Sequence, residues 1–277
     1  MENKKRVKIR QYWEERAKEY AATRATTTND VYLRELEISS IIQTLQEIQM
    51  VNGTVLDVGC GDGYSMLAVA KALPNLSFLG VDYSEQMIKL AIENLNGVPQ
   101  LKAQVSFVVG DVMDLSPICG DSPFDLIISD RCLINLESFG SQTQAIREIA
   151  RYVKGGGYYM AIENFIEGHE NMNRARIAVG LQEILVRWHN LYFKETEFVK
   201  NTETFFNILG FKEFSSSYYF ATRVVYAKMC QMRDEEPDYQ HEIHQLSVHL
   251  PWIGQFSPIR MVVMQRNLVQ NGMKGNE

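Results

Sequence analysis

The sequence predicts an α/β fold in which helices cover both faces of a doubly wound sheet. Short apolar runs that end in glycine or aspartate alternate with amphipathic segments of helical length, as such a sheet requires. The chain has 277 residues, which is enough to bury a sizeable core. Its composition, 45% hydrophobic and 22% charged, is typical of globular proteins. These observations favour one globular fold with additional segments attached to it.

Two helices are expected before the first strand. The first covers residues 12–20, and four of its side chains fall near one face: Tyr12, Trp13, Ala17 and Tyr20. This face could pack on the core or cover a binding cleft. The second helix covers residues 31–50 and is amphipathic, and Asn52-Gly53 ends it before the first strand.

Residues 55–64, VLDVGCGDGY, form the most informative segment. An apolar strand leads through Asp57 into a turn crowded with glycines, where backbone can approach a ligand closely. Dinucleotide sites share this design, but Tyr64 stands where their fingerprint has its last glycine. Asp57 would repel a pyrophosphate and suits a cation. The loop therefore favours S-adenosylmethionine, whose methionine part carries an α-ammonium group.

Later segments continue the strand and helix alternation. A helix over 64–73 follows the glycine loop, the run 76–79 leads to Asp82, and Ser84 is expected to cap a helix over 85–95. Asp82 follows Asp57 by 25 residues, at the end of a second strand, where a carboxylate can accept both hydroxyls of a ribose. Three further segments fit a third strand, a fourth strand and the turn before a fifth: 108–112, 124–130 and 152–157.

In order and spacing, these segments resemble the class I S-adenosylmethionine-dependent methyltransferases over about residues 10–165. The resemblance implies a Rossmann-like seven-stranded sheet with N-terminal lid helices and an antiparallel edge. Residues 210–214, continuing through 218–220, fit strand six, and residues 259–266 fit strand seven. The chain departs from the family at Gly155, where a proline is usual.

The resemblance also implies the cofactor and its contacts. S-adenosylmethionine would be the methyl donor and S-adenosylhomocysteine the product, and the aspartate after the third strand, Asp111, would hold the adenine amino group. The residues expected to bind the cofactor are Tyr12, Tyr20, Asp57, Gly59, Cys60, Gly61, Asp82, Tyr83, Met87, Gly110, Asp111, Val112 and Asp130.

Two long segments exceed what a minimal fold of this kind needs. One runs from 163 to 198, after strand five, and the other from 223 to 257, between strands six and seven. We expect both insertions to form a cap that carries specificity. The chain then divides into N-terminal lid helices (1–50), a cofactor-binding core (51–165), and the cap with the last two strands (166–277).

Methyl transfer from a sulfonium is an in-line displacement, in which a hydroxyl acceptor needs a general base and an amine needs only its lone pair. We predict His189 as this base, with Glu163 as the next candidate. Each also has a structural interpretation, His189 as a histidine hydrogen-bonded under a turn and Glu163 as an anchor for the chain beyond strand five. The residues expected to bind the acceptor are Arg131, Asn164, Trp188 and Tyr192, although Arg131 could simply pair with Asp130.

A looser resemblance to small-molecule methyltransferases of bacterial surface-polysaccharide and natural-product pathways implies the acceptor class. The leading hypothesis is O-methylation of a sugar or sugar-like metabolite, including nucleotide-linked or phosphorylated ones. The alternatives are N-methylation of an amino sugar or small amine, and a non-catalytic partner protein with a methyltransferase fold. A dinucleotide oxidoreductase is disfavoured by Asp57 and Tyr64.

Charge and residue usage limit the partners. A net charge of −6 argues against a nucleic-acid substrate, and no run of about 18 apolar residues predicts a membrane span. Four scattered cysteines without a CxxC pair suggest reduced thiols in a cytoplasmic enzyme. Either a monomer or a homodimer is expected. His241, His244 and His249 have a spacing that could bind zinc, but no fourth ligand is visible, so no metal is expected.

Overall fold

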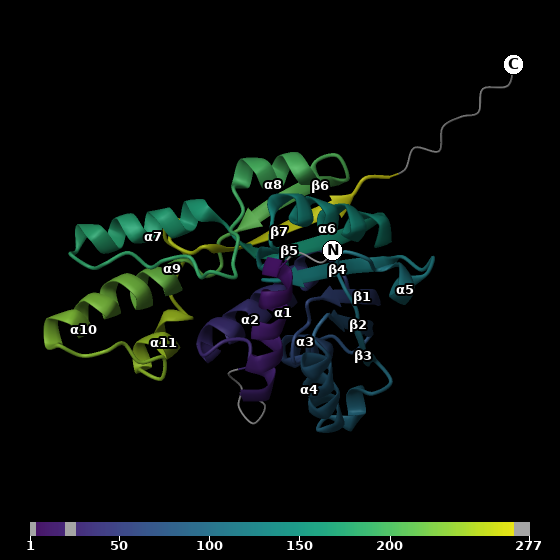
Figure 1. Ribbon diagram of the computed structural model, residues 1–277, viewed down its shortest axis with the longest axis horizontal. Coiled ribbons are helices and arrows are strands. Elements are labelled where there is room, and N and C mark those ends of the chain that lie inside the picture. The colour runs from purple at the N-terminus through teal and green to yellow at the C-terminus, as the bar shows by residue number, and fades with distance from the viewer. Residues whose placement is uncertain (1–3, 20–25, 269–277) are drawn as a thin grey trace, which may run out of the picture.

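The computed structural model describes residues 4–19 and 26–268, and its centre is a seven-stranded sheet (Figure 1). The strand order is β3-β2-β1-β4-β5-β7-β6, with β7 antiparallel to both of its neighbours and the other pairs parallel. The strands are β1 (Gly53–Val58), β2 (Leu76–Asp82), β3 (Val105–Val109), β4 (Phe124–Asp130), β5 (Val153–Asn164), β6 (Phe206–Lys212) and β7 (Ile259–Arg266). The order reverses between β1 and β4, where ligands of doubly wound sheets bind.

Helices α2, α3 and α4 begin at the positions that the sequence predicts and end within three residues of them, whereas α1 begins at Lys4, well before the predicted start at residue 12. The bounds are α1 (Lys4–Glu19), α2 (Val31–Glu47), α3 (Tyr64–Ala72), α4 (Glu85–Asn96), α5 (Ser116–Cys119), α6 (Phe139–Tyr152), α7 (Ile166–Ala178), α8 (Glu195–Thr202), α9 (Ser216–Tyr219), α10 (Ala227–Arg233) and α11 (Glu242–Ser247). Three short turns are η1 (Pro99–Leu101), η2 (Leu133–Asn135) and the π-helical η3 (Phe220–Tyr226). Ser84 caps α4 as expected, because its Oγ accepts a hydrogen bond from the Met87 amide at 3.1 Å.

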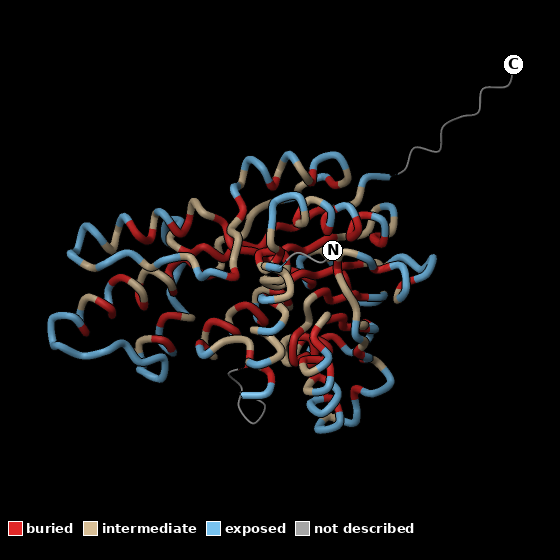
Figure 2. The backbone as a smooth tube through the Cα atoms, viewed as in Figure 1, coloured by how far each residue is buried: buried red, intermediate tan, exposed pale blue. Residues whose placement is uncertain are grey.

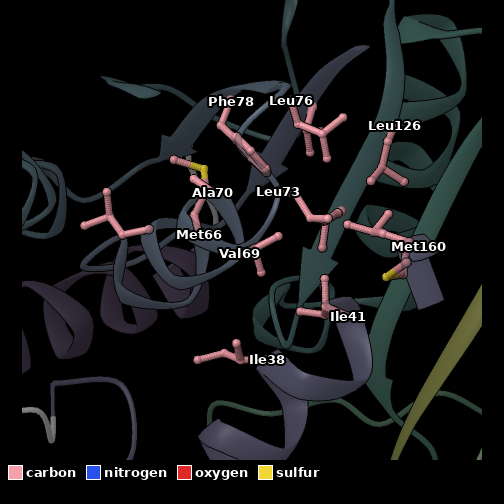
Figure 3. Close-up of a cluster of buried hydrophobic side chains, with 14 of the residues drawn as sticks. Ile38, Ile41, Met66, Val69, Ala70, Leu73, Leu76, Phe78, Leu126 and Met160 are labelled. Carbon is pink, nitrogen blue, oxygen red and sulfur yellow. The ribbon is translucent and has the colours of Figure 1, made fainter. Parts of the chain in front are cut away.

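Apolar side chains fill both faces of the sheet. Figure 3 shows one face, where Ile38 and Ile41 of α2 and Val69 of α3 pack toward Leu126 and Met160 of the central strands. On the other face, side chains of α6 and α8 pack against the same strands. Burying a side chain of this size stabilises the fold by about 1.5–3 kcal/mol. The sheet is therefore a rigid base for the groups at its edge.

The extension of strand six through residues 218–220 is wrong. After Lys212 the chain turns, and residues 216–226 are helical, as α9 and η3. The aromatic residues suited a strand, but the hydroxyl of Tyr218 is buried against Asp30 and His244, where it has polar partners. A tertiary contact thus decided the local structure over strand propensity. The second insertion accordingly spans 213–258, longer than predicted.

The two insertions lie side by side beyond one end of the sheet. In Figure 1, α7 of the first and α10 of the second extend to the left, away from the strands, and Figure 2 shows that their outer turns are exposed. The second insertion is fixed to α2, because Asp30, the N-cap of that helix, pairs with Arg223 and accepts from Tyr218. None of the helices in residues 4–19 and 26–268 is long and apolar enough to cross a membrane.

Candidate active site

A cavity opens at the carboxyl ends of β1, β2 and β4, where the strand order reverses. On the sheet side it is lined by Asp57, Gly59, Cys60, Gly61, Asp62, Ser65, Asp82, Tyr83, Met87, Asp130, Arg131, Cys132, Ile134 and Asn135. On the other side it is lined by Trp13 and Thr27, which lie before β1, and by Arg187, His189 and Asn190 of the first insertion. Segments far apart in the chain therefore meet over one space.

The glycine loop forms the floor of this cavity. Gly59 has a φ of +75°, and a Cβ there would lie 2.5 Å from Sγ of Cys132. Gly63, the N-cap of α3, has a φ of +72°, and its Cβ would lie 2.4 Å from Cζ of Phe107. Both positions need glycine, because other residues would be strained and would clash. Of the loop glycines, Gly59 and Gly61 line the cavity, so no side chain stands between their backbone and a ligand there.

Two carboxylates flank the loop, and they differ in their partners. Asp82 accepts hydrogen bonds from the amides of Gly61 at 3.0 Å and Ser84 at 2.8 Å. Burial raises the pKa of Asp82 to about 6, and these two bonds oppose the rise. A carboxylate has about four acceptor positions, so Asp82 can still accept from a ligand.

The carboxylate of Asp57 has no hydrogen bond or ion pair with any residue in the described part of the chain. Burial, together with the nearby carboxylates of Asp130 and Asp82, raises its pKa to about 8. A cation placed beside Asp57 would relieve both effects, since it neutralises the charge that burial disfavours. The cavity floor therefore fits a cationic ligand, and S-adenosylmethionine has the right charges.

A smaller pocket adjoins the cavity and shares Gly59, Asp82 and Tyr83 with it. It contains three residues predicted to bind the cofactor, Gly110, Asp111 and Val112, of which Asp111 was predicted to hold the adenine amino group. Arg6 of α1 reaches over this pocket and forms an ion pair with Asp111. The pocket thus contains the aspartate that the sequence predicts to hold adenine, and the carboxylate of Asp111 is covered by Arg6 of α1.

Helix α1 lies across the cavity and is held by aromatic contacts. The rings of Tyr12 and His189 stack with 4.5 Å between their centroids, and the ring of Trp188 packs against both of them. Nε1 of Trp13 donates to Asn135 at 3.3 Å. The backbone of the 187–193 segment is fixed as well, because the Leu191 amide donates to the Ile134 carbonyl at 2.7 Å. These contacts place the predicted base in the cavity.

His189 is only 3% exposed, and its Nδ1 is buried without a hydrogen-bond partner among the described residues. Nε2 is therefore the ring nitrogen that can meet a ligand. Burial lowers the pKa of His189 to about 4, and the positive charges of Arg187 and Arg16 add to the effect. The imidazole is consequently neutral at physiological pH and carries one lone pair. The interpretation of His189 as a hydrogen-bonded histidine under a turn does not fit this geometry.

Glu163 lies beneath the cavity lining, at the end of β5. Its carboxylate accepts hydrogen bonds from Ser129 Oγ at 2.9 Å and from the amides of Leu133 and Ile134 at 3.0 and 3.2 Å. Burial raises its pKa to about 7, against the effect of these bonds. The arrangement caps η2 and anchors the chain beyond β4, which matches the structural interpretation of this residue more closely than the catalytic one.

Arg131 lines the cavity, but its charge is already paired. Its guanidinium contacts Glu37 of α2 at 2.8 Å and Asp130 at 3.4 Å. Its backbone has a φ of +51°, a left-handed conformation that is uncommon outside glycine. The strained turn and the two carboxylates hold the guanidinium at the strand end. The ion pair with Asp130 that the sequence suggested is present.

The other residues predicted to bind the acceptor lie around the cavity rather than in its lining. Trp188 contacts the rings of Tyr12 and His189. Burial raises the pKa of the Tyr192 hydroxyl, and the nearby side chains of Asn164 and Asn190 oppose this rise. Tyr20 lies outside the described residues. Their roles in binding stay predictions.

Several lining residues were not predicted from the sequence. Asp62 sits between two glycines of the loop, and its position in that motif was a sufficient signal. Thr27, Asn135 and Arg187 gave no signal, because each reaches the cavity through the path of the chain outside the strands. Asn190 directly follows Trp188 and His189, which were both predicted as site residues.

The histidines of the second insertion have structural partners. Nδ1 of His244 hydrogen bonds with the Tyr218 hydroxyl at 2.6 Å, and the ring of His241 stacks on Tyr226 at 4.4 Å. Within residues 4–19 and 26–268, no group of three or more histidine, cysteine, aspartate or glutamate side chains is arranged to hold a metal ion.

Comparison with known proteins shows the family of this chain. A family described as "Methyltransferase domain" matches residues 50–192, just over half of the chain. Ajmaline N-methyltransferase of Rauvolfia serpentina is 35% identical over 102 residues, which cover 37% of this chain and 33% of that protein. Malonyl-[acyl-carrier protein] O-methyltransferase of Priestia megaterium is 29% identical over 131 residues, 46% of this chain and 44% of that one.

The chain thus spans less than half the length of either curated relative. Among solved structures, magnesium protoporphyrin IX methyltransferase of Synechocystis PCC 6803 with bound SAM superposes with a TM-score of 0.60. Its sequence identity is 15%, and the match covers 96% of this chain and 98% of that one. At this identity, the likeness concerns the fold alone.

Proposed function

The chain belongs to the class I S-adenosylmethionine-dependent methyltransferases, and we propose that it methylates a hydroxyl of a small, polar, sugar-like acceptor. The observation that supports this choice of acceptor is the neutral, unpartnered imidazole of His189 in the cavity. An amine acceptor needs no base once it is neutral, whereas a hydroxyl does. The relatives include N- and O-methyltransferases, so the choice rests on this side chain.

The residues on the sheet side suit the cofactor. When bound, S-adenosylmethionine would supply its sulfonium methyl group to the acceptor, and the sulfur would leave as the neutral thioether of S-adenosylhomocysteine. Asp57 would hold its ammonium, Asp82 its ribose hydroxyls, and Asp111 its adenine amino group once Arg6 moves from that carboxylate. The exposed backbone of the glycine loop allows close approach.

His189 and its neighbours suit the acceptor. The lone pair of the neutral imidazole can accept the proton of an acceptor hydroxyl as the new bond to carbon forms. The aromatic rings of Tyr12 and Trp188, which pack on His189, hold the imidazole in place and offer apolar surface for a sugar ring. Helix α1 covers the cavity and excludes water, which matters because water would compete as a proton acceptor and disorder the reactants.

The test compares His189→Ala and His189→Gln with the parent enzyme on a panel of hexoses, nucleotide-linked hexoses and the matching amino sugars. Formation of S-adenosylhomocysteine identifies the acceptor. We expect a hydroxyl acceptor, a kcat for both variants lower by about 10²-fold or more, and nearly unchanged affinity for S-adenosylmethionine. With the pKa of His189 lowered to about 4, kcat should fall only below about pH 5.

A near-native kcat of the variants on a hydroxyl acceptor would refute the base role. A pH profile that follows deprotonation of an amine, with effects of His189→Ala mainly on KM, would instead support the N-methyltransferase alternative. Absence of turnover with every acceptor, despite tight cofactor binding, would favour the non-catalytic partner protein.

A further inference from the structure

Arg187 differs from the other arginine of the cavity because its charge is unpaired. It lines the cavity together with His189 and Asn190 and is exposed at its rim. Its guanidinium has no ion pair or hydrogen bond with any residue of 4–19 and 26–268. Arg131, in contrast, is held by Glu37 and Asp130. Arg187 is therefore the guanidinium of this cavity that can bind a ligand without breaking an ion pair.

The carboxylates of the cavity and its unpaired guanidinium lie on different sides, since Arg131 on the sheet side is paired with Glu37 and Asp130. Among the described lining residues, the four carboxylates all belong to the sheet side: Asp57, Asp62, Asp82 and Asp130. The other side carries Arg187, and Lys8 of α1 lies nearby with its Nζ 4.9 Å from the ring centroid of Trp188. Acids on one side suit a cationic cofactor, and cations on the other suit an anion.

We propose that Arg187 binds a phosphate or carboxylate group of the methyl acceptor, with the acceptor hydroxyl directed to His189. This inference rests on the proposed function and narrows its substrate class to anionic acceptors. A guanidinium suits this task because its donors match the planar or tetrahedral oxygens of such groups in pairs. His189 lies two residues along the chain, is almost fully buried and lines the same cavity, so this segment presents both side chains to one ligand space.

Binding of an anion at Arg187 would also change the basicity of His189. The positive charge of Arg187 contributes to the low pKa of His189. An anion on Arg187 would cancel part of this charge, so it would raise the basicity of the imidazole when the acceptor is in place. Tyr12, Trp13, Arg16 and Trp188 are the other groups that face His189, and of these Arg16 carries a charge that the anion would also offset. An anionic acceptor would thus activate its own base.

Titration of small anions against the protein saturated with S-adenosylhomocysteine tests this site without turnover. Inorganic phosphate and acetate are the probes, at constant ionic strength, and the readout is the ¹³Cε1–¹Hε1 resonance of His189, assigned with His189→Gln. We expect saturable shifts of this resonance and a higher apparent pKa of His189 with bound anion. The stronger of the two probes identifies the group as phosphate or carboxylate.

Arg187→Gln should weaken the saturable effect at least about tenfold, and Arg187→Lys should restore part of it. Arg233→Gln is the matched control, because it removes an exposed arginine of the cap that does not line the cavity. Absence of saturable binding, or equal binding by Arg187→Gln and the parent protein, would overturn the proposal. If the anions bind through Arg187 while His189→Ala keeps a near-native kcat, the base role fails and the anion site stands.

Discussion

The two sides of the cavity are built in different ways. The cofactor side consists of strand ends and the glycine loop, and its polar groups Asp57, Asp62 and Asp82 come from two consecutive strands and the turn between them. The acceptor side is assembled from α1 and the 187–193 segment, which are more than 160 residues apart in the chain. The first side is a property of the fold, whereas the second depends on how the insertions pack.

The two sides also differ in the direction in which the pKa values of their ionisable groups are shifted, and this difference indicates which charge each side is suited to bind. Buried carboxylates on the cofactor side have raised pKa values, so they favour a cation. The buried imidazole on the acceptor side has a lowered pKa, beside an unpaired guanidinium. The cofactor side thus has carboxylates and a guanidinium that is already paired, that of Arg131, whereas the described lining of the acceptor side has an unpaired guanidinium and no carboxylate. The reaction brings the two ligands together between these sides.

The largest expected effect concerns the pH dependence of stability. Asp57 binds its proton more tightly in the folded protein, so its contribution is full below its unfolded pKa near 4 and is lost as pH rises through about 8. At about 1.4 kcal/mol for each pKa unit, the unliganded protein should lose roughly 2–4 kcal/mol from this group between pH 5 and 8. Urea unfolding of Asp57→Asn should show a flatter profile than the parent protein.

His189 should act in the opposite direction, because its folded pKa is lowered. Its contribution is lost as pH falls from about 6.5 to about 4, so His189→Gln should lessen the loss of stability on the acid side. The account would be contradicted if the free energy of unfolding depended on pH in the same way in Asp57→Asn, in His189→Gln and in the parent protein, because the two sides would then not have opposite environments.

Next in size is the loss of cofactor affinity in Asp82→Ala. The change removes a carboxylate that accepts from the Gly61 and Ser84 amides and would accept from the ribose, so binding should weaken by about 1.5–3 kcal/mol or more. Calorimetry with S-adenosylhomocysteine measures this. Asp82→Asn keeps one acceptor oxygen and should lose less. Equal affinity of Asp82→Ala and the parent, or comparable binding of NAD, would refute the assignment of this side to S-adenosylmethionine.

A smaller effect is expected at the boundary of the two sides, where Arg6 of α1 pairs with Asp111. The adenine amino group and Arg6 would compete for the same carboxylate. Since the pair is partly exposed, its strength is at most about 1 kcal/mol, and Arg6→Ala should tighten cofactor binding by no more than about fivefold. Weaker binding by Arg6→Ala would show that Arg6 contacts the cofactor instead of competing with it.

The smallest expected effect is that of a chelator. Neither side contains a cluster of metal ligands within the described ranges, and the proposed chemistry needs none. EDTA should therefore leave kcat unchanged. If EDTA abolished turnover and Mg²⁺ or Zn²⁺ restored it, metal binding by the histidines of the second insertion would have to be considered again.

The cofactor side could be predicted from the sequence because strand order and spacing fix it. Once residues 55–64 are a strand and a glycine turn, Asp57 must stand at the carboxyl edge, and the same reasoning places Asp82 and Asp111. Short-range chemistry also decides such features as the Ser84 cap. On the cofactor side, the residues that form the site are close to each other in the chain, so the local sequence is enough to predict their positions.

The acceptor side could be predicted only in part. His189 was found through its chemistry, but nothing local shows that Leu191 would bond to Ile134 and carry Arg187 to the cavity. The aromatic residues around Tyr218 predicted a strand. The contact that makes this segment helical instead, between Tyr218 and Asp30, joins residues 188 positions apart and could not be read from the local sequence. Glu163 looked catalytic by position, yet its lone pairs are taken by Ser129, Leu133 and Ile134. Long-range partners decided each case.

The most direct test of the division of the cavity is the proton balance of cofactor binding. Calorimetric titration of S-adenosylmethionine at pH 7, in buffers of different ionisation enthalpy, counts the protons released. Asp57, with a pKa of about 8, is mostly protonated before binding and should ionise beside the ammonium, so the parent protein should release nearly one proton. Arg187→Gln should release the same number, and Asp57→Asn almost none. No release by the parent protein, or loss of the release in Arg187→Gln, would contradict the account.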